Sequence, residues 1–129
     1  MDLKGVRKII HRNREIIVID YSGYSGGVLI EILNEAQSLI LSEKKKCAVL
    51  SIANNKTFAS SPFIRHLENI FPNVAPLIEK QAIIGITPVQ AWIVKGINLW
   101  ANPKLCVFDS MDIALDYLTD NNKMKAALI

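Results

Sequence analysis

Three short apolar runs constrain the fold of this chain more than any other feature. They are "CAVLSIA" at residues 47–53, "QAIIGI" at 81–86 and "LCVFD" at 105–109. Each run has the length of a β-strand. The first is apolar without alternation, which is typical of a strand buried on both faces of a parallel sheet. Such a strand needs helices above and below it, so the segments between the runs decide the fold.

The segments between these runs have helical periodicity. From Val28 to Ile40, apolar residues recur at helical spacing, and polar residues fall on the other side. Ser25 is the N-cap that we expect for this helix. A second helix is predicted from about residue 61 to residue 80. We expect it to bend or break near Pro72 and Pro76, because proline interrupts helical hydrogen bonding.

Two further helices follow the later strands. Thr87 is the predicted N-cap of a helix over residues 88–101. Pro88 stands at its first position, where the missing N–H breaks no helical bond. The last helix lies within residues 109–120, and either Asp109 or Ser110 caps it.

The chain opens with two apolar runs, "VRKIIH" and "EIIVIDY", which Arg12, Asn13 and Arg14 separate. Asparagine tolerates the left-handed conformation of a tight turn, so these runs predict a β-hairpin. The complete order is ββαβαβαβα, which indicates a single α/β domain over residues 1–129. We expect a mostly parallel, mixed β-sheet with the N-terminal hairpin as its antiparallel edge and helices flanking it.

Composition argues against several classes of protein. The net charge is +3, and the basic run at residues 44–46 has no arginine or aromatic stripe beside it, so we expect no nucleic-acid partner. No apolar stretch approaches the length of a membrane helix, so no membrane insertion is expected. Cys47 and Cys106 each lie in an apolar run, which suits buried core positions in a reduced, cytoplasmic protein.

No residues have the spacing that a known reaction or metal site requires. His11 and His66 have no cysteine, histidine or carboxylate at metal-ligand spacing, so no metal or cofactor is predicted. Asp20 and Asp109 follow strands, where catalytic acids often lie in α/β folds, but a capping role explains both. We therefore predict no catalytic residues and no enzyme. A reaction at these aspartates or at the glycine-rich loop is the weakest alternative.

The glycine-rich loop "SGYSGG" lacks both common phosphate-binding patterns. We expect its glycines to serve the turn between a strand and a helix. Ser25, Gly26 and Gly27 would also place bare N–H groups at a helix start, so they form a candidate anion-binding loop.

The third predicted helix is apolar almost all round. Between residues 89 and 101, its polar side chains are Gln90, Lys95 and Asn98. Trp92 and Trp100 can belong to a core face, but the opposite side is apolar too. In so small a domain we expect an exposed apolar patch, and hence a dimer or a partner site. The alternative is that neighbouring elements cover the helix.

Four segments resemble the STAS domain. They are "REIIVIDYSG", "CAVLSIANNKTF", "KQAIIGITPVQAWIVKGINLW" and "LCVFDSMDIALDYL", spread over about residues 14–118. STAS domains occur in anti-sigma-factor antagonists and in the cytoplasmic tails of sulfate transporters. Of the STAS-like proteins, the chain looks closer to a group of small, stand-alone bacterial ones of largely unassigned function. The resemblance implies a STAS-like fold and a role in protein interaction.

The resemblance also implies a candidate phosphorylation site. In the antagonists, a strand leads to a loop that ends in Asp-Ser-Ser-Gly at a helix start, and a kinase phosphorylates the second serine. This chain has Ala59, Ser60, Ser61 and Pro62 at the matching place. Ser61, with Ser60 beside it, is therefore the candidate phosphoacceptor. The missing aspartate and glycine favour another role, in which Ser61 is an N-cap and Pro62 the first helical residue.

These features predict a non-enzymatic, cytoplasmic interaction module in bacterial signalling. Its partner would be a kinase, a regulator or a second copy of the chain. The expected partner-binding residues are Asn54, Asn55, Lys56, Phe58, Phe63, Trp92 and Trp100. The alternative is a carrier for a lipid or another small apolar ligand, because related α/β folds bind lipids beside the sheet and the apolar third helix could line such a cleft.

Overall fold

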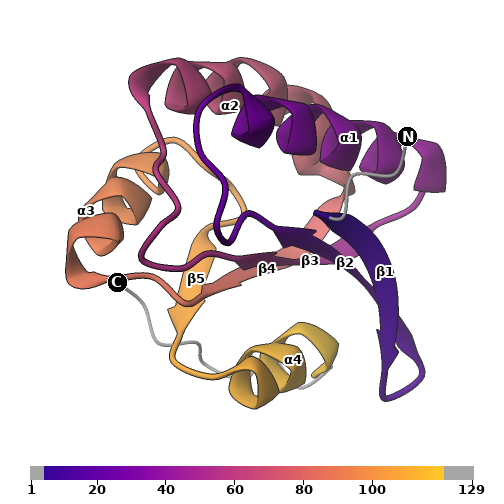
Figure 1. The fold of residues 1–129 in the computed structure, drawn as a ribbon. Helices are drawn as coiled ribbons and strands as arrows, with labels where there is room; N and C mark the ends of the chain where they lie inside the picture. Colours follow the sequence, from indigo (N-terminus) through magenta and orange to yellow (C-terminus); the bar gives the residue numbers. More distant parts are fainter. Residues whose placement is uncertain (1–4, 121–129) are drawn as a thin grey trace.

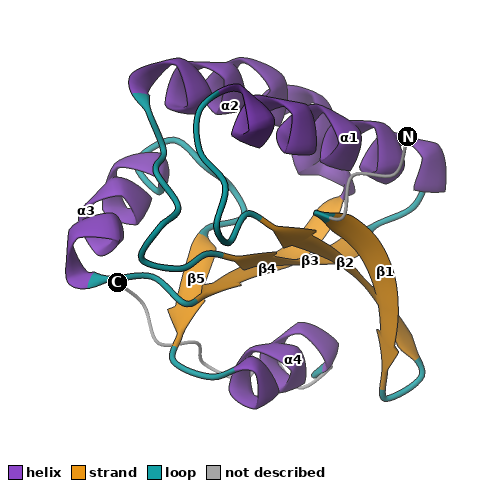
Figure 2. Cartoon of the chain, in the orientation of Figure 1, coloured by secondary structure: helices purple, strands orange, loops and turns teal. Residues whose placement is uncertain are grey.

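The computed structural model describes residues 5–120, and within them the chain forms one five-stranded sheet. Its strands are β1 (Val6–His11), β2 (Arg14–Asp20), β3 (Cys47–Ile52), β4 (Ile78–Ile84) and β5 (Leu105–Phe108). They lie side by side in chain order, β1-β2-β3-β4-β5 (Figure 2). Strand β1 is antiparallel to β2, and every later pair is parallel. The predicted mixed sheet with an antiparallel hairpin at its edge is confirmed.

Helices cover the two faces of the sheet unequally. The helices are α1 (Gly27–Glu43), α2 (Ser61–Val74), α3 (Pro88–Ile97) and α4 (Met111–Thr119), and the short 3-10 helix η1 (Ala75–Leu77) follows α2. Figure 1 shows α1, α2 and α3 on one side of the sheet and α4 on the other. The crossovers that join the parallel strands therefore run over one face, and α4 covers the opposite face after β5.

The hairpin turn has the geometry that its sequence predicts. Arg12 and Asn13 form the two-residue turn, with φ angles of 51° and 63°. Positive φ at both central residues matches the right-handed twist of the strands, and His11 pairs with Arg14 across the turn.

Alternation along the buried strands divides the core into two parts. Ile17, Ile19 and Val49 pack toward α1 and α2, whereas Val18 and Leu50 face α4. Because successive strand residues point to opposite faces, one apolar run supplies both cores. Cys47 and Cys106 are buried free thiols, as the sequence predicts.

The expected start of α1 and the expected end of α2 are wrong. Gly26, with φ of 62°, is the N-cap of α1 and contributes no side-chain bond, so Ser25 is not the cap. Ser25 instead forms an isolated bridge with Phe58. Helix α2 contains Pro72 and ends at Val74, two residues before Pro76. Residues 78–80 belong to β4, because the chain there pairs with β3.

The starts of α3 and α4 agree with the N-caps predicted from the sequence. Thr87 forms a capping box with Gln90, and Pro88 is the first residue of α3, as predicted. Ser110, rather than Asp109, caps α4 by accepting from the Ile113 N–H. Helix α3 ends at Ile97, before the predicted residue 101, because the Asn98 side chain bonds both backbone groups of Leu105.

Gly85 follows β4 in a conformation that favours glycine, with φ of 83°. A β-carbon at this position would overlap the carbonyl oxygen of Ala53. We expect Gly85→Ala to lower the free energy of unfolding by at least about 2 kcal/mol, measured by urea denaturation. Gly96→Ala is the control, because Gly96 is helical and no neighbouring element lies within 4 Å of the position that a methyl group would take. That change should raise the stability by about 0.5 kcal/mol, and equal effects of both changes would contradict the prediction.

Candidate functional site

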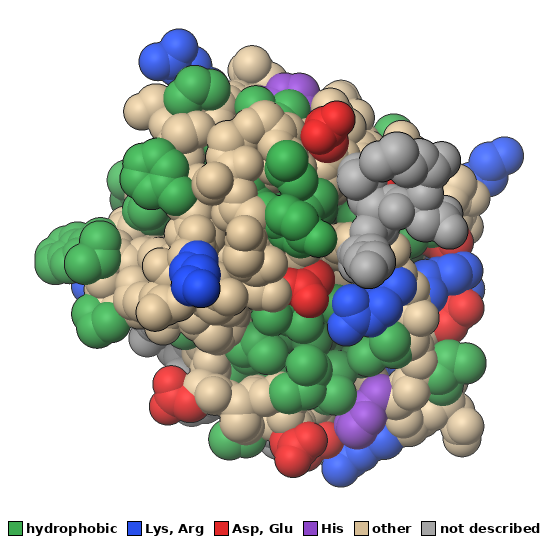
Figure 3. All heavy atoms as spheres, viewed as in Figure 1, with side chains coloured by type: hydrophobic (Ala, Val, Ile, Leu, Met, Phe, Trp, Pro, Cys, Tyr) green, Lys and Arg blue, Asp and Glu red, His purple; other side chains and the backbone are tan. Residues whose placement is uncertain are grey.

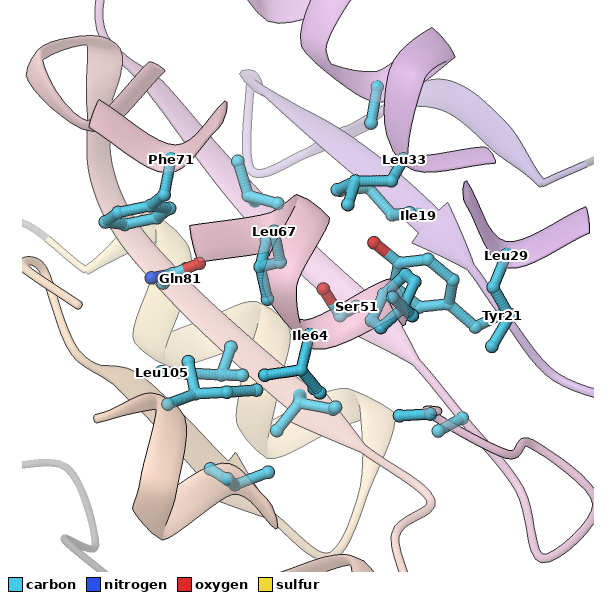
Figure 4. Close-up of a pocket in the computed structure, with 18 of the residues that line it drawn as sticks. Ile19, Tyr21, Leu29, Leu33, Ser51, Ile64, Leu67, Phe71, Gln81 and Leu105 are labelled. Atoms are coloured by element: carbon cyan, nitrogen blue, oxygen red, sulfur yellow. The ribbon is translucent and has the colours of Figure 1, made fainter. Parts of the chain in front are cut away.

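A cavity of about 130 Å³ lies between the sheet and helices α1, α2 and α3. Strands β2, β3, β4 and β5 form its floor, and the helices form its walls. Its lining is largely apolar, with aliphatic side chains from every wall, including Ile19, Leu29, Leu33, Ile64, Leu67 and Leu105 (Figure 4).

The cavity exists because the walls are packed unequally. Helix α1 buries five side chains and α2 buries four, and the two helices share a cluster with Leu29, Leu33 and Phe63. Among the described residues of α3, only Val94 and Ile97 are buried. Small side chains on the other walls, such as Ala36 and Ala53, do not fill the space that remains.

Tyr21 brings a hydroxyl group to the cavity wall. It follows β2, and its ring meets the ring of Phe63 edge to face, with centroids 5.6 Å apart. No residue between 5 and 120 hydrogen-bonds to its hydroxyl group. Burial raises the pKa of this phenol far above its ordinary value of 10.0. The group is therefore neutral, and as a donor and acceptor it has no partner in the described part of the chain.

Ser51 and Gln81 add two more polar groups to the floor. Ser51 is 8% exposed on β3, and its hydroxyl has no hydrogen-bond partner within the described part of the chain. Gln81 on β4 donates its side-chain N–H to the Pro103 carbonyl at 2.6 Å, while its oxygen points toward Leu67 (Figure 4). The cavity is thus an apolar space with a few polar atoms on its floor and wall.

The two unpartnered hydroxyls open onto the cavity rather than into packed protein. Within residues 5–120, every side-chain nitrogen or oxygen that is completely enclosed by protein has a hydrogen-bond partner. The hydroxyls of Tyr21 and Ser51 have none, so they are not completely enclosed. Both residues line the cavity, which is the open space available to them.

Gln90 ties the α3 wall to the loop between β3 and α2. Its amide nitrogen donates to the carbonyls of Asn54 at 2.8 Å and Thr57 at 2.9 Å. Its oxygen accepts from the Thr87 N–H at 2.7 Å. One side chain therefore caps α3 and fastens it to the neighbouring loop.

The expected partner-binding residues divide between the surface and the core. Asn55, Lys56, Phe58 and Trp92 are exposed, and Trp92, at 72% exposure, does not belong to the core face. The Asn54 side chain accepts hydrogen bonds within its own loop and from Gly23. Phe63 is buried in the cavity wall, and Trp100 packs on Phe71, because these aromatic rings are needed to cover the sheet.

The exposed apolar patch expected on α3 is present. Val89, Trp92 and Leu99 project from this helix and the turn after it, and Leu99 is 89% exposed. Figure 3 shows apolar side chains gathered on the left of the molecule, over α3. Lys95 lies over the Trp92 ring, 4.7 Å from its centroid. The apolar face is therefore accessible and has a positive charge on it.

The two candidate phosphoacceptors have different places at the start of α2. Ser60 is the N-cap, and its hydroxyl accepts from the Phe63 N–H at 3.4 Å. Ser61 is the first helical residue and is exposed, so the expected cap is shifted by one residue. The serine that caps the helix and the serine open to modification are thus distinct.

The other sequence candidates lie apart from the cavity. Ser25, Gly26 and Gly27 are exposed at the start of α1, where their anion-binding role stays a prediction. Asp20 accepts from the Ser22 N–H in the turn after β2, and Gly26 caps the helix that follows, so the capping role expected of Asp20 is wrong. Within residues 5–120, no group of three His, Cys, Asp or Glu side chains is placed to hold a metal ion.

The two histidines each contact a side chain of another element. The Nε2 atom of His11 lies 3.2 Å from Oδ1 of Asp116. His66 on α2 forms a hydrogen bond with the side-chain oxygen of Asn34 on α1. Asp109 is exposed beside the cap of α4. No helix in residues 5–120 combines the length and the apolar character that crossing a membrane requires.

Comparison with solved structures identifies the fold. A crystal structure of an uncharacterised protein of the DUF3478 family with a SpoIIAA-like fold, from Shewanella loihica PV-4, superimposes with a TM-score of 0.59. The match covers 92% of this chain and 97% of that one, at 13% sequence identity. The fold is SpoIIAA-like. The predicted STAS-like architecture is therefore confirmed, and an identity this low shows the fold alone. No family model and no curated protein matches the sequence.

Sequence reasoning missed the polar residues of the cavity, although a signal was present. Ser51 interrupts the apolar run "CAVLSIA", and Gln81 opens "QAIIGI". A polar residue within a strand buried on both faces must find a partner or face an internal space. Tyr21 carries no such local signal, because its burial depends on α2.

The raised pKa values of Tyr21 and Tyr117 predict that the protein loses stability at alkaline pH. The pKa of Tyr117 is raised to about 12, first by burial and then by its contact with Cys106, and the pKa of Tyr21 is raised by burial alone. Unfolded tyrosines ionise near pH 10, so the stabilisation is complete below pH 10 and is lost as pH rises toward the raised values. Tyr21→Phe should make the fall in unfolding free energy between pH 10 and 12 less steep. An unchanged slope in chemical denaturation would contradict this.

Proposed function

We propose that the chain binds a small apolar molecule in the cavity between the sheet and helices α1, α2 and α3. The observation that carries this proposal is the 130 Å³ space, lined by two hydroxyl groups that have no hydrogen-bond partner among residues 5–120. Apolar side chains around such a space have no packed neighbour on one side, and an apolar ligand would supply these contacts.

The geometry supports a binding role more directly than a catalytic one. The cavity lining contains aliphatic and aromatic side chains, two hydroxyl groups from Tyr21 and Ser51, Thr57, and three glutamines. Apolar walls with a few convergent polar groups are the usual form of a small-molecule site. Neither an ionised nucleophile nor a general base belongs to the lining in the described structure, so reversible binding is the function proposed.

A cavity-filling substitution tests this function. Ala36 on α1 lines the cavity and is 1% exposed, so Ala36→Met should fill part of the space and weaken toluene binding at least about tenfold. Ser38→Met, at an exposed position of the same helix, should leave toluene binding unchanged. The dissociation constants would come from NMR titration of ¹⁵N-labelled protein.

The same NMR titration shows which results would contradict the proposed binding function. Absence of toluene binding to the wild type, or equal binding to wild type and Ala36→Met, would contradict the proposal. Since Ala36→Met risks overpacking, Ala59→Leu on another part of the lining repeats the test, and near-ultraviolet circular dichroism verifies that each variant is folded.

A second candidate function is protein interaction, and the exposed face of α3 favours it. Phe58, Val89, Trp92 and Leu99 are large apolar side chains with at least 65% exposure. The Gln90 bonds hold the Phe58 loop beside α3, which places these side chains in one region. Exposed apolar side chains gathered in one region often mark an interface. A kinase or regulator acting at Ser61 remains a further prediction of the STAS-like resemblance.

Self-association provides the direct test of this second function. We expect sedimentation velocity to show a dimer of the wild type that Trp92→Ser and Leu99→Ser convert to monomer. Ile113→Ser is the control, because Ile113 is an exposed apolar residue on α4, across the sheet. A wild type that stays monomeric at the highest concentration reached would count against homodimerisation.

A further inference from the structure

The polar atoms of the cavity are arranged so that they can select a ligand. Ser51 is paired with Ile19 on the neighbouring strand, and Tyr21 follows Ile19 by two residues. Both hydroxyl groups point toward the space between Leu33 and Leu67 (Figure 4). Neither hydroxyl has a protein partner among the described residues. A hydroxyl that faces an apolar space without a partner is unfavourable, so a polar atom of a ligand or a water molecule has to meet this pair.

The charge of the lining restricts what that polar atom can be. No lysine, arginine, histidine, aspartate or glutamate lines the cavity in the described structure. A carboxylate or ammonium group would lose its hydration there without gaining an opposite charge. The raised pKa of Tyr21 has the same cause, because burial disfavours its ionised form. Hydroxyl groups satisfy a neutral donor or acceptor without this penalty.

The volume restricts the apolar part of the ligand. The cavity measures about 130 Å³, and an engineered apolar cavity of about 150 Å³ binds benzene. A six-membered ring or a short branched chain therefore has a suitable size for the cavity. A long acyl chain would exceed this volume.

We propose that the cavity selects an uncharged molecule with an apolar part about the size of a benzene ring and one hydrogen-bonding group, held by the Tyr21 and Ser51 hydroxyls. An alcohol, an aldehyde, a ketone or a primary amide belongs to this class, and a carboxylate does not. This inference rests on the proposed binding function and specifies its ligand.

Four matched probes test the class at pH 7. Toluene and benzyl alcohol differ by a hydroxyl group, and benzamide and benzoate have nearly the same shape but differ in charge. The carboxyl group of benzoate is ionised at this pH. By NMR titration of the full chain, benzyl alcohol should bind roughly fivefold more tightly than toluene. Benzamide should bind at least about tenfold more tightly than benzoate.

Removing each hydroxyl group tests whether Tyr21 and Ser51 cause the preference for benzyl alcohol over toluene. Tyr21→Phe and Ser51→Ala each remove one oxygen with little change of shape, and each should reduce the advantage of benzyl alcohol over toluene. Tyr24→Phe is the matched control, because Tyr24 is partly buried but does not line the cavity. It should leave both affinities unchanged.

The possible results distinguish a failure of this inference from a failure of the proposed binding function. Benzoate binding as tightly as benzamide would overturn the selection against charge. Two results would overturn the role of the Tyr21 and Ser51 hydroxyls in ligand binding. One is that benzyl alcohol binds no better than toluene, and the other is that its advantage survives both hydroxyl deletions. The two hydroxyls would then bond water rather than a ligand. In each of these cases toluene still binds, so the cavity function stands. Failure of all four probes to bind would overturn both.

Discussion

The pairing of β2, β3 and β4 into a parallel sheet is the constraint on which the rest of the structure depends. Their apolar residues alternate between two faces, so each face must be covered by helices. Helix α4 packs on one face through Ala114, Leu115 and Leu118. On the other face, the crossover helices α1, α2 and α3 together cover the apolar side chains of the strands. They cover the sheet without filling the space above it, and this produces the cavity.

Polar groups in that space follow from the same constraint. A hydroxyl on β3 and an amide on β4 would be unfavourable in a fully packed layer. Ser51 and Gln81 are compatible with the fold because the space above them is open, and Gln81 also bonds the Pro103 carbonyl. The cavity and its polar atoms therefore depend on each other. An entirely aliphatic floor would leave only size and shape to discriminate between ligands.

The sequence predicted the features that depend on local chemistry. The hairpin followed from Asn13, and the start of α3 followed from Thr87 and Pro88. The errors arose where distant contacts override local preference. Ser25 pairs with Phe58, and Gly26, with φ of 62°, takes its place as the cap of α1. The residues before Gln81 leave the helix to pair with β3. The cavity could not be predicted, because it depends on how three helices share one face.

The order of strands in the sheet has a consequence for how the chain folds as it is synthesised. Each strand pairs with the strand made just before it, so the sheet can grow along one edge without waiting for distant segments. Pairings between neighbours in the chain also keep loop-closure entropy small. The face formed by Ile16, Val18 and Leu50 is covered only when α4 emerges, so this face stays open to aggregation longest during synthesis.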